Sequence, residues 1–144
     1  MDGEKMNAKI YKFPENLAES EKITINLGFV DLGHIDLLVR DGFYGNRTDF
    51  IRTAIRNQLG QHSEQSKKSI TRQTMELGLR QYTKSDLEAL QTAGEKLRIK
   101  VLGLVTISSD VPPALALATI ESITVLGALH ASKEIKTALA DRIN

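Results

Sequence analysis

Residues 21–59, EKITINLGFVDLGHIDLLVRDGFYGNRTDFIRTAIRNQL, decide the fold of the first part of this chain. The stretch opens with KITINL, in which polar and apolar side chains alternate. The polar positions are Lys22, Thr24 and Asn26. The apolar positions are Ile23, Ile25 and Leu27. A period of two is typical of a strand with one buried face, so residues 22–27 are predicted to be a strand.

After this strand the apolar period changes to that of a helix. The apolar positions at helical spacing are Leu32, Ile35, Leu38 and Val39. Gly42 then predicts a left-handed cap that ends the helix. A short turn, FYGN, leads to Asn46, which is predicted to cap a second helix, with Asp49 in its first turn. The apolar stripe of the second helix is Phe50, Ile51, Ala54, Ile55 and Leu59.

One strand and two short helices bury too little apolar surface to be stable alone. A second copy would solve this problem, because two strands could then pair antiparallel across a two-fold axis above four helices. This arrangement, with the segment NRTDFIRTAIRNQL opening the second helix, resembles the ribbon-helix-helix family of DNA-binding proteins, the CopG/Arc/MetJ type. The resemblance covers residues 21–59. It implies a dimeric, sequence-specific transcriptional regulator of the repressor kind, and the family also includes antitoxins and plasmid-partition proteins.

The resemblance also implies which residues would contact DNA. The outward strand residues Lys22, Thr24 and Asn26 would read bases, since a two-stranded ribbon fits the major groove. At the start of the second helix, Asn46, Arg47 and Thr48 would bind the phosphate backbone, because a helix N-terminus offers free N–H groups and partial positive charge. Simple helix capping is the alternative role for the second set.

The charge of the chain gives only weak support for DNA binding. The net charge is +1, and residues 1–62 hold eight lysines and arginines against nine aspartates and glutamates. A general phosphate-binding surface would be more basic. A dimerisation or interaction protein without DNA binding therefore stays open as an alternative, and salt-dependent duplex binding would separate the two.

The last third of the chain contains an internal similarity. Residues 99–108, IKVLGLVTIS, align with residues 123–132, ITVLGALHAS, at an offset of 24. Each segment predicts a strand followed by a short helix, and successive units of this kind favour parallel neighbouring strands. The alternative is one long helix over residues 112–129, which β-branched residues and Gly127 oppose.

The predicted fold class is therefore α+β, with four segments. A polar arm over residues 1–20 precedes the dimeric ribbon-helix-helix domain over residues 21–60. A linker over residues 61–80 leads to a small α/β module of two or three 24-residue repeats over residues 81–144. This module would serve oligomerisation or signal input.

No enzyme is expected, since the sequence has no catalytic motif and no cysteine. His34, His62 and His130 lack ligand spacing, so neither a metal nor another cofactor is expected. The first residues lack a hydrophobic signal core and no segment suits a membrane span, which predicts a cytoplasmic protein. The expected partners are double-stranded DNA and further copies of the chain.

Overall fold

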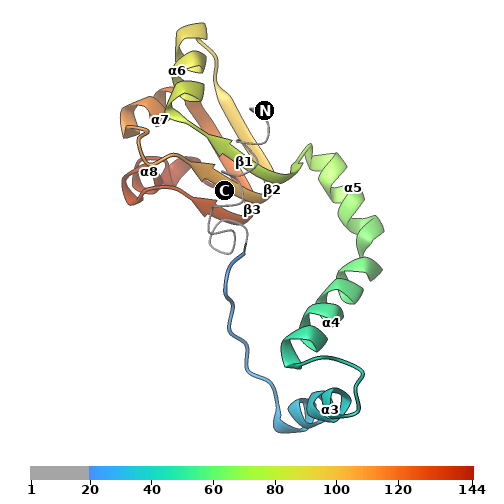
Figure 1. Cartoon of the computed structure of the whole chain (residues 1–144). Helices are drawn as coiled ribbons and strands as arrows, with labels where there is room; N and C mark the ends of the chain where they lie inside the picture. Colours follow the sequence, from blue (N-terminus) through green and yellow to red (C-terminus); the bar gives the residue numbers. More distant parts are fainter. Residues whose placement is uncertain (1–19) are drawn as a thin grey trace, which may run out of the picture. The chain divides into compact units, whose positions relative to one another are not determined.

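The structure is a computed structural model of one chain, and it describes residues 20–144 (Figure 1). The chain divides into two compact units, Met1–Ser63 and Glu64–Asn144. The arm predicted over residues 1–20 lies outside the described residues, apart from its last residue.

The described part of the first unit, residues 20–63, contains an irregular segment and two helices. Residues 20–28 adopt neither helix nor strand, and they are followed by α3 (Phe29–Arg40) and α4 (Arg47–Gln61). The predicted left-handed cap of α3 is confirmed, because Gly42 has a φ of +88°. The N–H of Phe43 donates to the carbonyl of Leu38 at 3.0 Å, which closes the last turn of the helix.

The first unit buries very little. Ile35 is the only buried side chain among residues 20–63. Many large apolar side chains of this unit are exposed instead: Ile23, Ile25, Leu27, Phe29, Val30, Leu37, Phe43, Ile55 and Leu59. Residues 20–63 of a single copy therefore lack the core that a stable domain requires.

Residues 61–80, which the sequence suggested as a linker, contain regular structure. Helix α5 (Ser63–Gln73) follows α4, and β1 (Glu76–Tyr82) comes after it. α5 has no buried residue, and its sequence has no apolar stripe from which a helix could be predicted. Its Glu, Gln, Lys and Arg residues are nevertheless good helix formers.

The second unit is a parallel sheet with helices packed on one face (Figure 1). After β1 come α6 (Lys84–Ala93), β2 (Leu97–Ile107), α7 (Pro113–Thr119), β3 (Ile120–His130), α8 (Lys133–Ala138) and the 3-10 turn η1 (Ala140–Arg142). The strand order is β1-β2-β3, and both pairs are parallel. Strand–helix–strand connections of this kind place parallel strands side by side.

The predicted strands of the last third are confirmed as neighbours. Ile99 lies opposite Ile123, and Val101 lies opposite Val125, as the offset of 24 predicts. The long-helix alternative is wrong, because α7 ends at Thr119 and β3 runs through the segment that it would occupy. The three strands thus form one small sheet.

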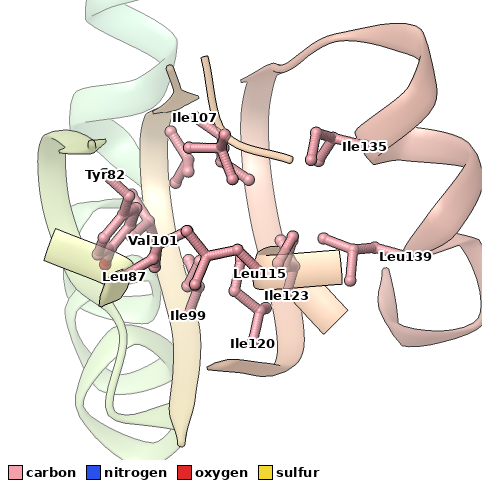
Figure 2. Close-up of a cluster of buried hydrophobic side chains, with 13 residues drawn as sticks. Tyr82, Leu87, Ile99, Val101, Ile107, Leu115, Ile120, Ile123, Ile135 and Leu139 are labelled. Carbon is pink, nitrogen blue, oxygen red and sulfur yellow. The ribbon is translucent and has the colours of Figure 1, made fainter. Parts of the chain in front are cut away.

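The core of the second unit lies between the sheet and its helices (Figure 2). Strand residues Ile99, Val101 and Ile123 are at most 1% exposed. The helices contribute Leu87, Leu115, Ala116 and Ile135, and Leu139 follows at the C-cap of α8. Because α6, α7 and α8 all contribute to this one core, they cover the same face of the sheet.

Candidate nucleic-acid interface

The segment proposed to read bases is exposed on both faces. The outward residues Lys22, Thr24 and Asn26 are exposed. On the other face Ile23 is 74% exposed, Ile25 58% and Leu27 37%. The sheet pairs within residues 20–144 do not include this segment. Ile23 and Ile25 therefore remain mostly uncovered within the part of the chain that the structure describes.

The start of α4 is capped as predicted. Asn46 is in extended conformation, and its Oδ1 accepts a hydrogen bond from the N–H of Asp49 at 2.8 Å. In return, Asp49 Oδ2 accepts from the N–H of Gly45 at 2.9 Å. The reciprocal donor in a capping box is the cap residue itself, so this box is displaced by one residue. The Asn46 side chain uses its oxygen for capping and keeps its amide N–H groups for another acceptor.

Arg47 is held by a partner that the sequence did not indicate. Its Nε and Nη2 donate to Oδ1 and Oδ2 of Asp36, each at 2.8 Å. This two-pronged hydrogen bond lowers the pKa of Asp36 and raises the pKa of Arg47. Both side chains are about half exposed, at 55% for Arg47 and 52% for Asp36. The pair joins α3 to the first residue of α4.

The pairing does not exhaust the hydrogen-bonding capacity of Arg47. A guanidinium has five N–H donors, and Asp36 engages two of them. The remaining donors can bind a second anion while the carboxylate stays in place. However, the nearby negative charge of Asp36 offsets the attraction of Arg47 for phosphate, so this residue is also a brace between two helices.

Thr48 lies on the first turn of α4 and is exposed. The first N–H groups of a helix have no carbonyl partner within that helix, and the dipole places partial positive charge there. Since Asn46 caps the N–H of Asp49, the N–H groups of Arg47 and Thr48 are the ones that this cap leaves available. The structure thus brings the three predicted phosphate contacts together at one helix end.

The turn before α4 is fixed by an aromatic contact. The rings of Tyr44 and Phe50 meet edge to face, with centroids 5.0 Å apart and an interplanar angle of 85°. Pairs of this geometry stabilise beyond the area that they bury. Together with the Asp36–Arg47 ion pair, this contact sets the position of the α4 start.

Two further basic residues on α4 were not among the predicted contacts. Arg52 and Arg56 are exposed, one helical turn apart, and form no salt bridge within residues 20–144. Their spacing along NRTDFIRTAIRNQL was visible in the sequence. Nothing in that spacing distinguishes a phosphate contact from an ordinary solvated helix face.

The described residues contain no feature that supports metal binding or membrane spanning. Over residues 20–144, no group of three or more His, Cys, Asp or Glu side chains is placed to hold a metal ion. No helix in the same range is both long enough and apolar enough to cross a membrane.

Comparison with known proteins identifies the family. The profile of the ribbon-helix-helix transcriptional regulator family matches residues 18–136. The chain belongs to this family. The match extends far beyond residues 21–59, where the sequence resemblance was found, and includes most of the second unit. No curated protein and no solved structure matches the chain. Ribbon-helix-helix regulators typically bind DNA as dimers and are generally not enzymes.

Proposed function

We propose that this ribbon-helix-helix protein is a dimeric, sequence-specific DNA-binding regulator that acts as a repressor. Residues 22–27 of two copies would pair as an antiparallel ribbon and enter the major groove. The C-terminal unit belongs to the same regulator and would supply contacts between chains.

The exposure of Ile23, Ile25 and Leu27 carries this proposal. These residues alternate with polar residues, so ribbon pairing buries one set and presents the other. Complete burial of one such side chain contributes about 1.5–3 kcal/mol. Other apolar residues of this unit are exposed too, and among residues 20–63 only Ile35 is buried, so the gain from a second copy is large.

The outward residues suit base reading by their chemistry. Lys22 can donate to O6 and N7 of guanine, and Asn26 can bind adenine through two hydrogen bonds. Thr24 can donate, accept or contact the thymine methyl group. A ribbon formed by two copies would present Lys22, Thr24 and Asn26 of both chains. Since one residue separates each reader from the next, the side chains project from the same face.

The start of α4 would position the ribbon on the phosphate backbone. Its available N–H groups, the Asn46 amide and the unused donors of Arg47 all lie at one helix end. Phosphate contacts fix register and orientation but carry no sequence information. The Asp36–Arg47 pair would keep this helix end in the geometry that the ribbon requires.

Near-zero charge favours one alternative, a ribbon that dimerises without binding DNA. Residues 1–62 are slightly acidic overall, and Asp36 further neutralises Arg47. An antitoxin or plasmid-partition role is a second alternative. The C-terminal unit has its own buried core, which favours a regulator over a protein with a disordered toxin-binding tail.

Selection of bound sequences from random duplex DNA by the full chain tests the proposal. Enrichment of a two-fold symmetric sequence is expected, and the Thr24→Ala/Asn26→Ala double variant should lose the enrichment while remaining a dimer. Binding should weaken with added salt. A dimer that enriches no sequence and shows no salt-dependent duplex binding would establish the non-DNA alternative instead.

A further inference from the structure

The sheet of the second unit has one covered face and one open face. Helices α6, α7 and α8 all pack on the face that contains Ile99, Val101 and Ile123. The opposite face carries two rows of apolar side chains in register across the three strands. The first row is Leu77, Leu102 and Leu126, and the second is Leu79, Leu104 and Ala128. We refer to these six residues as the leucine face.

The leucine face is unusual for a parallel sheet. Parallel sheets occur almost only where both faces are covered. Here Leu77 is 71% exposed, Leu79 57% and Leu126 54%. A contiguous apolar patch of this kind marks an interaction site.

We infer that the leucine face packs against the leucine face of a second copy of this chain. The two copies would be related by a two-fold axis that runs along the row Gly78, Gly103 and Gly127, which lie opposite one another in the sheet. Sheets packed face to face lie about 10 Å apart with their strands aligned within roughly 30°. The strands of the two copies would run in opposite directions.

This axis brings complementary side chains together. The row through Leu102 would face the row through Leu104 of the other copy, because the two rows flank the glycine row. At the edge formed by β3, Leu126 would meet the smaller Ala128, so that a large side chain faces a small one. Interdigitation of this kind fills a core without overpacking.

Lys100 on β2 selects this direction over the opposite one. Lys100 lies on the outward side of β2 and forms no salt bridge within residues 20–144. If the strands of two copies ran in the same direction, each Lys100 would face another Lys100. With opposed strands, Lys100 faces Thr106 of the other copy, since both residues lie three positions from Gly103.

The small area of the leucine face favours a second copy of the chain as its occupant. Three strands and seven residues of β1 span a flat footprint of roughly 300 Å² at ordinary strand spacing. A stable interface needs about 800 Å² per partner. The leucine face alone is therefore too small for a tight complex. The ribbon dimer of the proposed function, on which this inference rests, would raise the effective concentration of the second face.

Crosslinking of the full chain tests the arrangement directly, because the protein has no cysteine of its own. The Lys100→Cys/Thr106→Cys variant should give covalent dimers with a bismaleimide of about 10 Å span. The two positions in one chain are about 20 Å apart along the strand, so one molecule cannot join its own pair. The Lys100→Cys single variant should not crosslink. Efficient crosslinking of that single variant, or none in the double variant, would overturn the inference.

Sedimentation of the full chain tests the leucine face itself. Leu77→Glu/Leu126→Glu places charges on side chains that are exposed in one copy, so each chain should fold normally. The assembly should dissociate at a concentration about tenfold higher or more, because each pairing buries unpaired carboxylates. Leu117→Glu on α7, at a leucine 37% exposed, is the matched control and should have no effect.

Equal sedimentation of wild type and the double variant would overturn the inference, as would equal loss in the control. Circular dichroism checks that each variant is folded, and Leu77→Gln/Leu126→Gln repeats the test without charge if the first pair unfolds. Neither experiment requires DNA. Failure of the leucine face is thus distinguishable from failure of the proposed function, which duplex binding reports.

Discussion

A methyl group added at Gly103 would test how closely the three strands of the second unit are joined. Gly78, Gly103 and Gly127 lie opposite one another in the sheet and have φ values of +124°, +143° and +126°. A Cβ atom at position 103 would lie 2.0 Å from the carbonyl oxygen of Gly78. Real Cβ atoms essentially never approach a neighbour closer than 3.0 Å. In Gly103→Ala, the backbone of β1 must therefore move.

The cost has two parts. A residue other than glycine held at this φ costs about 1–3 kcal/mol. Opening the β1–β2 pair to admit the methyl group adds about 1–3 kcal/mol of packing disruption. We therefore expect Gly103→Ala to lower the free energy of unfolding of the second unit by about 2–6 kcal/mol.

Gly78→Ala is the matched control, since it adds the same methyl group in the same row. Its φ is also positive, but a Cβ there meets nothing within 4 Å. It should cost only the backbone strain of about 1–3 kcal/mol. Urea unfolding of the full chain, followed by amide hydrogen exchange in β2, would give both values for this unit. Equal losses in the two variants would refute the argument from the close approach of the strands.

Four further predictions concern the first unit. Asn26→Ala should leave the dimer intact and weaken operator binding by about 1–3 kcal/mol, and an unchanged ratio of operator to random-sequence affinity would contradict base reading. Ile25→Lys should abolish dimer and fold together by placing a charge on the shared apolar face, and a native melting temperature would mean that the strand faces are assigned the wrong way round. Arg47→Ala should weaken operator and random DNA about equally and reduce the salt slope by about one, whereas loss at a single base pair would place Arg47 in the groove. Arg47 lowers the pKa of Asp36 in the folded state, so the stability that this pair contributes should be complete above the ordinary pKa of 3.8 and should be lost in stronger acid. Asp36→Asn should remove that part of the acid dependence of stability, as NMR titration of α3 and α4 would show.

Features set by neighbouring residues could be predicted from the sequence. The left-handed conformation of Gly42 and the capping of α4 by Asn46 each depend on a few adjacent positions. The pairing of Ile99 with Ile123 was also predictable, because two similar segments favour equivalent places in one sheet. The family match over residues 18–136 confirms the family that the resemblance indicated.

Features set by distant residues or by weak patterns could not be predicted. Asp36 and Arg47 are eleven positions apart, and only the packing of α3 on α4 brings them together. α5 has no buried side chain, so its sequence resembles a linker. β1 was missed for a related reason, since it has one buried residue, Tyr82, and most of its apolar side chains face outward.

The two units differ in whether a segment with strand-like alternation can pair within one chain. In the second unit, β1 and β2 are each followed by a helix and a further strand within about two dozen residues, so the sheet forms within one chain. In the first unit, residues 22–27 precede α3 and then α4, and the described part of this unit contains no strand with which they could pair. An identical segment with the same alternating faces exists in every other copy of the chain. The exposure of Ile23 and Ile25 therefore supports the proposed pairing of two copies, which the DNA-reading proposal requires.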